Sequence, residues 1–178
     1  TEERELREEA KKEIAEADLL VVNTPGNPTG YTLSREQAKN IGKCAEENNT
    51  FLVSDEVYHR LTYGREHYST AEFSCDSAII GSVSKNHAMT GWRIGWVVDK
   101  QENIEQYAKV SRASTACPPR ISQYAAIEAI QNDSHVEEMR ETYEERRDLL
   151  VERMNDLGWN FVAPEGAIYA FPEVGKDS

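Results

Sequence analysis

Four short apolar segments, each followed by a polar or glycine-containing stretch, place the strongest constraint on how this chain folds. They are too short for ordinary helices, and their aliphatic residues favour β-strands. The segments are 19–22, 51–53, 78–83 and 94–98. Ser34 and Gln37 form a capping box that opens a helix to about residue 48, between the first two segments. Strands that alternate with helices predict an α/β fold: a three-layer, mostly parallel sheet covered by helices.

The first apolar segment, 19–22, is a run of four aliphatic residues without alternation. Such runs are typical of strands in parallel sheets, because both faces of those strands are covered. We therefore expect this strand to be buried on both faces.

Polar residues follow three of the predicted strands by a few positions. Asn27 lies in a loop, residues 23–30, that contains two prolines and two glycines. Asp55 follows the second strand, and Lys85 follows the third. Ligands of open α/β sheets collect beyond the carboxyl ends of the strands. We therefore expect these three loops to converge on one site.

The chain beyond residue 100 has a helical pattern. Pro119 suits the first turn of a helix that reaches about Asn132. Ser134 and Glu137 form a second capping box, which opens a long helix with an apolar stripe, and Gly158 suits its end. That helix is long enough to connect two domains.

Two domains are expected from this pattern. Residues 1–133 are predicted to be part of a large domain, and residues 134–178 a linking helix and the start of a partial α+β small domain. Within the second part, residues 159–171 predict a strand, a turn and a second strand. The segment 2–17 has the character of the middle of a charged helix, so we expect the chain to be a piece of a longer protein.

Charge and cysteine content argue against several classes of function. The formal net charge is −12, so the surface repels nucleic-acid phosphates and anionic lipid headgroups, and we expect neither as a partner. No apolar run approaches the roughly 20 residues that cross a bilayer. The cysteines are odd in number and widely spaced, which argues against a disulfide framework and a zinc site and suits the cytoplasm. They are Cys44, Cys75 and Cys117. We expect no metal.

The strongest chemical signal is the segment 81–96, GSVSKNHAMTGWRIGW. A lone lysine after a strand is usually a surface residue. Here Ser82 and Ser84 precede Lys85, and Arg93 follows eight residues later. This set suits a phosphorylated aldehyde, because an amine forms an imine with the carbonyl. The guanidinium and the hydroxyls are suited to the phosphate.

The segment resembles the serine–lysine and glycine–arginine–glycine–tryptophan signature of fold-type-I enzymes that use pyridoxal 5′-phosphate (PLP), specifically the class I/II aminotransferases. Two further motifs match in the same order: Asn-Pro-Thr-Gly at 27–30 and Asp-Glu-Val-Tyr at 55–58. The resemblance covers about residues 18–172.

The resemblance implies a role for each residue around the cofactor ring. Lys85 would be the Schiff-base lysine, later freed as the base that moves a proton between the substrate α-carbon and the cofactor. Asp55 would pair with the pyridine nitrogen. Tyr58 and Asn27 would donate hydrogen bonds to the phenolic oxygen, and a cis peptide would precede Pro28, as in many relatives.

The resemblance also implies a phosphate site made by Ser82 and Arg93, with Ser84 as a helper. Relatives have further functional parts: an N-terminal glycine turn and a stacking aromatic ring, and a C-terminal arginine that binds the substrate carboxylate. These are expected in the parent protein, outside the 178 residues. We expect the chain alone to bind PLP weakly and to turn over little.

The leading interpretation is a PLP-dependent aminotransferase that moves an amino group from an L-amino acid to a 2-oxo acid. A C–S β-lyase or a related synthase on the same fold is an alternative, because it shares the first chemical step. A PLP-sensing domain of a transcription regulator is another. The resemblance implies a homodimer, while the identity of the amino donor stays open.

Overall fold

The computed structural model describes residues 6–173. Within them, four strands form one sheet in the order β1-β2-β3-β4. The strands are β1 (Leu19–Asn23), β2 (Phe51–Asp55), β3 (Ser77–Ser82) and β4 (Gly95–Val98). The α-helices are α1 (Glu8–Glu16), α2 (Arg35–Asn48), α3 (Val83–Asn86), α4 (Gln101–Ser114), α5 (Arg120–Gln131) and α6 (Ser134–Asp156). Two 3₁₀ turns are η1 (Thr70–Phe73) and η2 (Thr90–Trp92). None of the described helices is both long and apolar enough to cross a membrane.

The sheet is mostly parallel, as the sequence predicts. β1, β2 and β3 are parallel, and β4 runs antiparallel to β3. The reason is the short connection: Ser82 ends β3, Gly95 begins β4, and these two residues pair in the ladder. The intervening chain forms only α3 and η2, which leaves no helix of the length that a parallel crossover needs. The α/β fold is confirmed.

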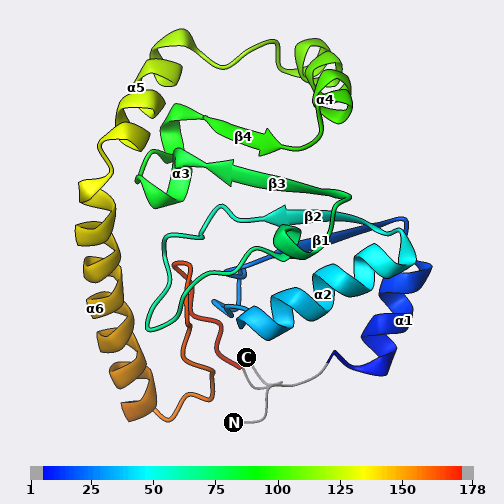
Figure 1. The fold of residues 1–178 in the computed structure, drawn as a ribbon. Helices are drawn as coiled ribbons and strands as arrows, with labels where there is room; N and C mark the ends of the chain where they lie inside the picture. Colours follow the sequence, from blue (N-terminus) through cyan, green and yellow to red (C-terminus); the bar gives the residue numbers. More distant parts are fainter. Residues whose placement is uncertain (1–5, 174–178) are drawn as a thin grey trace.

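One face of the sheet carries a hydrophobic core. Ile14 of α1, Ala45 of α2 and Leu52 of β2 are buried together, and Leu20 packs against them. On the opposite face of β1, Leu19 and Val21 are 52% and 58% exposed. The expectation that this strand is buried on both faces is therefore wrong for the described residues, because α1 and α2 cover only one side. These two helices are seen in Figure 1 beside β1 and β2.

Of the two capping boxes predicted at helix starts, one is present in the structure and one is not. Ser34 and Gln37 make the predicted capping box at the start of α2. The box predicted at Ser134 is wrong: Asp133 is the N-cap and makes no side-chain cap bond. Its carboxylate instead accepts a hydrogen bond from Arg60, at 2.7 Å. The helix predicted over 2–17 is shorter in the described residues, where α1 spans Glu8–Glu16, and residues 2–5 lie outside the described part.

Helix α6 ends as predicted, but the chain after it does not form the predicted strands. Its last helical residue is Asp156, and Gly158 takes a positive φ of 72°. Between 159 and 171 the only ladder contact is an isolated bridge from Thr62 to Gly166. A strand needs a neighbouring backbone for its N–H and C=O groups, and no second strand lies beside this segment among the described residues. The division into domains at 133 and 134 stays a prediction.

Figure 1 shows how these elements frame one edge of the sheet. The arrows of β2 and β3 point toward α6, whereas β4 runs the opposite way. Helix α6 descends along this edge, and the segment after it turns back up beside α6, on the side of α2, toward the loops that follow β1 and β2. Val136 of α6 is buried, and Met139 and Tyr143 pack against the side chain cluster around Tyr58. The carboxyl ends of the parallel strands therefore face α6 and the C-terminal segment.

Candidate active site

The carboxyl ends of β1 and β2 are held side by side. Asn23 and Asp55, their last residues, are directly opposite in the parallel ladder. The Asn23 amide donates to the carbonyl of Asp55 at 3.2 Å, and Thr24 N donates to the same carbonyl at 3.2 Å. One carboxylate oxygen of Asp55 accepts from Val57 N at 3.3 Å. The Asp55 carboxylate is thereby placed at the strand end and is half-buried.

The loop after β1 carries Asn27. Its backbone N–H donates to the side-chain oxygen of Asn23 at 2.7 Å, and its side chain is exposed. The peptide between Asn27 and Pro28 is cis, as the resemblance implies. Gly30 has a φ of 68°, and an added Cβ there would lie 2.3 Å from Pro164. Glycine is therefore required where this loop meets the C-terminal segment.

Lys85 lies in the short helix that β3 feeds directly. Ser82 caps this helix: its hydroxyl accepts from Ser84 N at 2.9 Å and donates to the carbonyl of Ile94 at 2.8 Å. The buried side chains of Val83 and Asn86 fix the helix on either side of Lys85. The Lys85 ammonium nitrogen lies 5.9 Å from the centre of the Tyr58 ring. An amine and a phenol thus meet at the edge where Asp55 ends β2.

Tyr58 is 3% exposed. Its hydroxyl lies 2.6 Å from the hydroxyl of Tyr169. Burial raises the pKa of Tyr58, and the hydrogen bond with Tyr169 and the nearby charge of Asp55 raise it further. The phenol is therefore neutral, and able to donate a hydrogen bond, over the whole physiological pH range.

The three residues predicted to bind a phosphate are only partly brought together. Ser82 and Ser84 lie at the start of α3, and the Ser82 hydroxyl reaches the carbonyl of the residue after Arg93. Arg93 has a left-handed backbone with a φ of 55°, is exposed, and donates to the carbonyl of Thr90 at 2.9 Å. The structure thus brings the backbone of Ile94, the neighbour of Arg93, to Ser82. Among residues 6–173, no hydrogen bond joins the Arg93 guanidinium to either serine.

Two buried residues support the site and were given no role from the sequence. Asn86, fully buried beside Lys85, accepts from Arg60 N at 3.3 Å and contacts the ring nitrogen of His59 at 3.0 Å. Glu56, beside Asp55, accepts a hydrogen bond from Ser69. The Asn86 contacts tie the loop after β2 to the helix that carries Lys85, and the Glu56–Ser69 bond holds two parts of that loop together.

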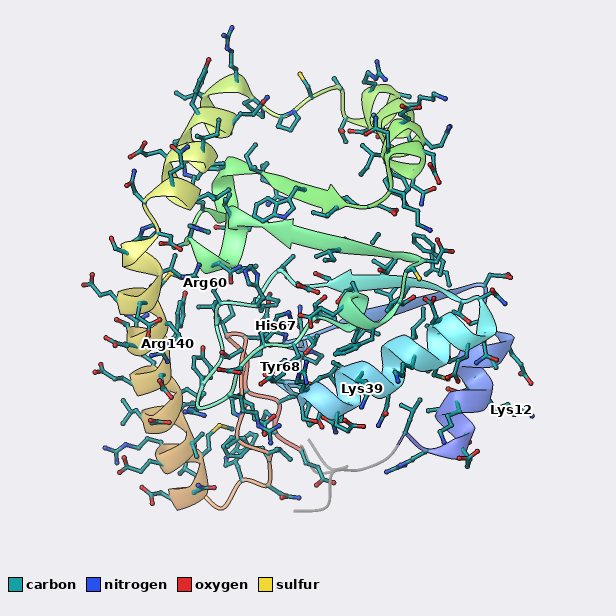
Figure 2. All side chains as sticks on the ribbon, viewed as in Figure 1. Lys12, Lys39, Arg60, His67, Tyr68 and Arg140 are labelled. Atoms are coloured by element: carbon teal, nitrogen blue, oxygen red, sulfur yellow. The ribbon has the colours of Figure 1, made fainter. Side chains whose placement is uncertain are left out.

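Glu56 also pairs with His67, whose Nε2 lies 3.2 Å from Oε2 of Glu56. Figure 2 labels His67 between α6 and the helices on the sheet, with Arg60 nearer α6. Burial raises the pKa of the Glu56 carboxyl, but hydrogen bonding by His67 and Ser69 outweighs it and holds the pKa below its ordinary value of 4.5. His59 is buried enough that its pKa is lowered, so it is a neutral structural group at pH 7.

We expect the buried Glu56 carboxylate to make stability acid-sensitive. A carboxyl whose pKa is lowered by folding stabilises the folded state above its unfolded pKa, and this contribution is lost as pH falls through the lower folded value. In the full-length protein, Glu56→Gln should cost about 1.5–3 kcal/mol at pH 7. The difference in free energy of unfolding between this variant and the wild type should become smaller as pH falls below 4.5. Urea denaturation at several pH values measures it.

The exposed carboxylate of Glu72 in η1 provides the matched control. Glu72→Gln should leave the free energy of unfolding within about 0.5 kcal/mol of the wild type at each pH. A Glu56→Gln deficit that stays constant from pH 7 to pH 3.5 would show that the carboxylate charge contributes nothing.

The donor set fits a phosphorylated pyridine aldehyde. Lys85 offers an amine, Asp55 a carboxylate at the strand end, and Tyr58 a buried neutral phenol beside that amine. Ser82 and Ser84 lie at the start of the same short helix. Within residues 6–173, no three or more His, Cys, Asp or Glu side chains cluster in a way that could hold a metal ion. The chemistry available here is that of an amine, a carboxylate and hydrogen-bond donors.

Comparison with known proteins agrees with this chemistry. Residues 3–177 match the family described as "Aminotransferase class I and II". The aspartate aminotransferase of Bacillus sp. strain YM-2 is 40% identical over 164 residues, which cover 88% of this chain and 42% of that protein. The probable N-acetyl-LL-diaminopimelate aminotransferase of Bacillus subtilis is 42% identical over 159 residues, covering 87% and 40%.

Solved structures give the same result. A tetra mutant of the Thermus thermophilus aspartate aminotransferase in complex with tryptophan has a TM-score of 0.88 and 39% identity, covering 93% of this chain and 45% of that one. The aromatic aminotransferase of Pyrococcus horikoshii has a TM-score of 0.88 and 34% identity, covering 95% and 48%. The chain spans less than half the length of each of these relatives.

Proposed function

Because the chain belongs to the class I and II aminotransferase family, whose members depend on PLP, we propose that the protein that carries it is an aminotransferase. It would move an amino group from an L-amino acid to a 2-oxo acid. The observation that carries the proposal is the meeting of the Lys85 amine with the Tyr58 phenol, 5.9 Å from its ring centre, at the carboxyl end of the sheet.

The roles of the residues follow from their chemistry. When bound, PLP supplies an electron-accepting ring that takes up the electron pair left when a bond at the substrate α-carbon breaks. Lys85 would hold the cofactor carbonyl through its amine and later move the proton at the α-carbon. Asp55, at the end of β2, would keep the ring nitrogen protonated by its negative charge.

Hydrogen-bond donors would hold the phenolic oxygen and the phosphate of the cofactor. Tyr58 and Asn27 would donate to the phenolic oxygen; Tyr58 is supported by its buried position beside Lys85, and Asn27 by its place in the loop beside Asn23. Ser82, Ser84 and Arg93 would bind the phosphate. For Ser82 and Arg93 this requires each side chain to leave the backbone carbonyl to which it donates now, that of Ile94 and that of Thr90.

Incubation of the full-length protein with PLP, 2-oxoglutarate and a panel of amino acids tests the proposal. Aspartate heads the panel, because several relatives are named aspartate aminotransferases; aromatic amino acids and N-acetyl-LL-diaminopimelate follow. We expect glutamate to form together with the 2-oxo acid of the donor, and only when 2-oxoglutarate is present. Release of pyruvate and ammonia without any 2-oxo acid would instead support a β-lyase, which the names of these relatives do not favour.

We further propose a cytoplasmic homodimer. Apolar side chains of α4 and α5 are exposed, which supports the packing of another protein surface against these helices. Among them are Val110, Ile121, Tyr124 and Ile127. The three cysteines are free, which suits a reducing compartment. Light scattering should give twice the chain mass for the full-length protein, and a monomer mass at micromolar concentration would contradict the dimer. Recovery of the protein outside the cytosolic fraction of its cell would contradict the location.

A further inference from the structure

Tyr169 reaches the candidate site from a distant part of the chain. Its hydroxyl lies 2.6 Å from that of Tyr58, 111 residues away in sequence. The two rings are edge to face, with centres 5.8 Å apart and planes at 78°. At this distance the two phenols share one hydrogen bond, in which either oxygen is able to donate.

The backbone that carries Tyr169 is anchored next to Tyr58. Ala167 N donates to the carbonyl of Leu61 at 2.9 Å, and the Tyr63 hydroxyl donates to the carbonyl of Ala167 at 2.5 Å. Ala167 itself is fully buried, with a φ of 59°. These bonds fix the segment two residues before Tyr169, and the Tyr169 side chain itself packs against the cluster of Tyr58, Leu61 and Ala167.

The count of protons decides the direction of the hydrogen bond. A phenol has one O–H to donate and lone pairs to accept with. If Tyr58 gives its proton to the phenolic oxygen of the cofactor, it has none left for Tyr169 and must accept from it. Tyr169 then donates to Tyr58, and Tyr58 donates to the cofactor. A donor that also accepts a hydrogen bond is polarised and donates more strongly.

We propose that Tyr169 is a positioning residue of the cofactor site, whose hydroxyl donates to Tyr58 and so orients and strengthens the hydrogen bond from Tyr58 to the phenolic oxygen of PLP. The inference rests on the proposed function. It gives the segment after α6 a direct influence on the electronic state of the cofactor, through a residue that touches neither the cofactor nor the substrate.

The test is a pH titration of the visible absorbance band of the lysine-bound cofactor in the full-length protein. A hydrogen bond donated to the phenolic oxygen stabilises the form that has lost the proton shared with the lysine nitrogen. Tyr169→Phe removes the hydroxyl and keeps the ring, so the pH midpoint of the band should rise by about half a unit. Tyr58→Phe should raise it by more.

Tyr143→Phe is the matched control, because Tyr143 packs in the same cluster and its hydroxyl makes no hydrogen bond within the described part of the chain. It should leave the midpoint unchanged. In the Tyr58→Phe background, Tyr169→Phe should produce no further shift, because its effect passes through Tyr58. An unchanged midpoint in Tyr169→Phe, or equal shifts with and without Tyr58, would overturn the inference.

The outcomes separate this inference from the proposed function. A full-length protein with no visible band after incubation with PLP would contradict the function itself. A normal band whose pH midpoint is unchanged by Tyr169→Phe would contradict only the inference. Should Tyr169→Phe fold poorly by circular dichroism, Tyr169→His serves as the second variant. Its ring N–H is able to donate, so a folded His variant should keep the midpoint nearer to wild type than a folded Tyr169→Leu.

Discussion

Lys85→Ala in the full-length protein is expected to abolish the visible absorbance band of the bound cofactor and to lower transamination on the order of 10⁴-fold. The amine is the group that would bind the cofactor carbonyl and move the α-carbon proton, and alanine does neither. The short helix should remain, because Val83 and Asn86, which are buried on either side of Lys85, are unchanged. Absorbance after dialysis and a coupled assay of glutamate formation measure the two effects.

Lys100→Ala is the control for this prediction. Lys100 pairs with Asp76 at 3.0 Å at an exposed position, where its side chain is 47% exposed. Its loss should leave both the band and the rate close to wild type, because surface ion pairs contribute little. If the Lys85 variant kept its band after dialysis, Lys85 would not be the attachment point.

Asp55→Asn is expected to lower the transamination rate roughly a hundredfold to a few thousandfold. Asparagine has nearly the same shape and keeps an oxygen for the N–H of Val57, which Asp55 binds at 3.3 Å. It lacks the negative charge that would hold the cofactor ring nitrogen protonated. Breaking a buried ion pair costs about 3–5 kcal/mol, which corresponds to that range of rates. Steady-state kinetics with saturating PLP measures it.

The control is Asp76→Asn, because Asp76 is the exposed partner of Lys100 and lies just before β3. It should change the rate less than twofold. An Asp55→Asn variant with a wild-type rate would remove Asp55 from the proposed mechanism, whatever the outcome for Lys85. A variant that binds PLP normally but turns over slowly would place its role in the chemical step.

Most of the strand and helix positions were predictable because their signals are local. A run of aliphatic residues bounded by polar loops forms a strand wherever it pairs, so β1 to β4 lie within a few residues of their predicted ranges. The side chains of Ser34 and Gln37 each accept a hydrogen bond from the backbone N–H of the other, so this helix start depends only on residues three positions apart. The box predicted at Ser134 did not form because the helix begins one residue earlier, with Asp133 as its N-cap, whose side chain pairs with the distant Arg60.

The support around the candidate site was not predictable in the same way. Asn86 follows Lys85 in sequence, but only the packed structure turns it toward His59 and Arg60. Tyr169 belongs to a segment predicted as strand, and nothing in its neighbours indicates a partner 111 residues away. The predicted strands of that segment are absent because a strand depends on a second backbone, which a single stretch of sequence does not specify.

The amino-acid sequence by itself determined which chemical groups are present: an amine, a carboxylate and a guanidinium that follow apolar strands. Residue type and short-range periodicity are properties of the chain alone. Tertiary structure decided which groups meet. The Tyr58–Tyr169 contact, the burial of Glu56 against His67 and the open face of β1 all depend on segments that pack only after the chain folds. Hydrogen bonds and burial between distant segments are set by packing geometry, and a local pattern does not contain that geometry.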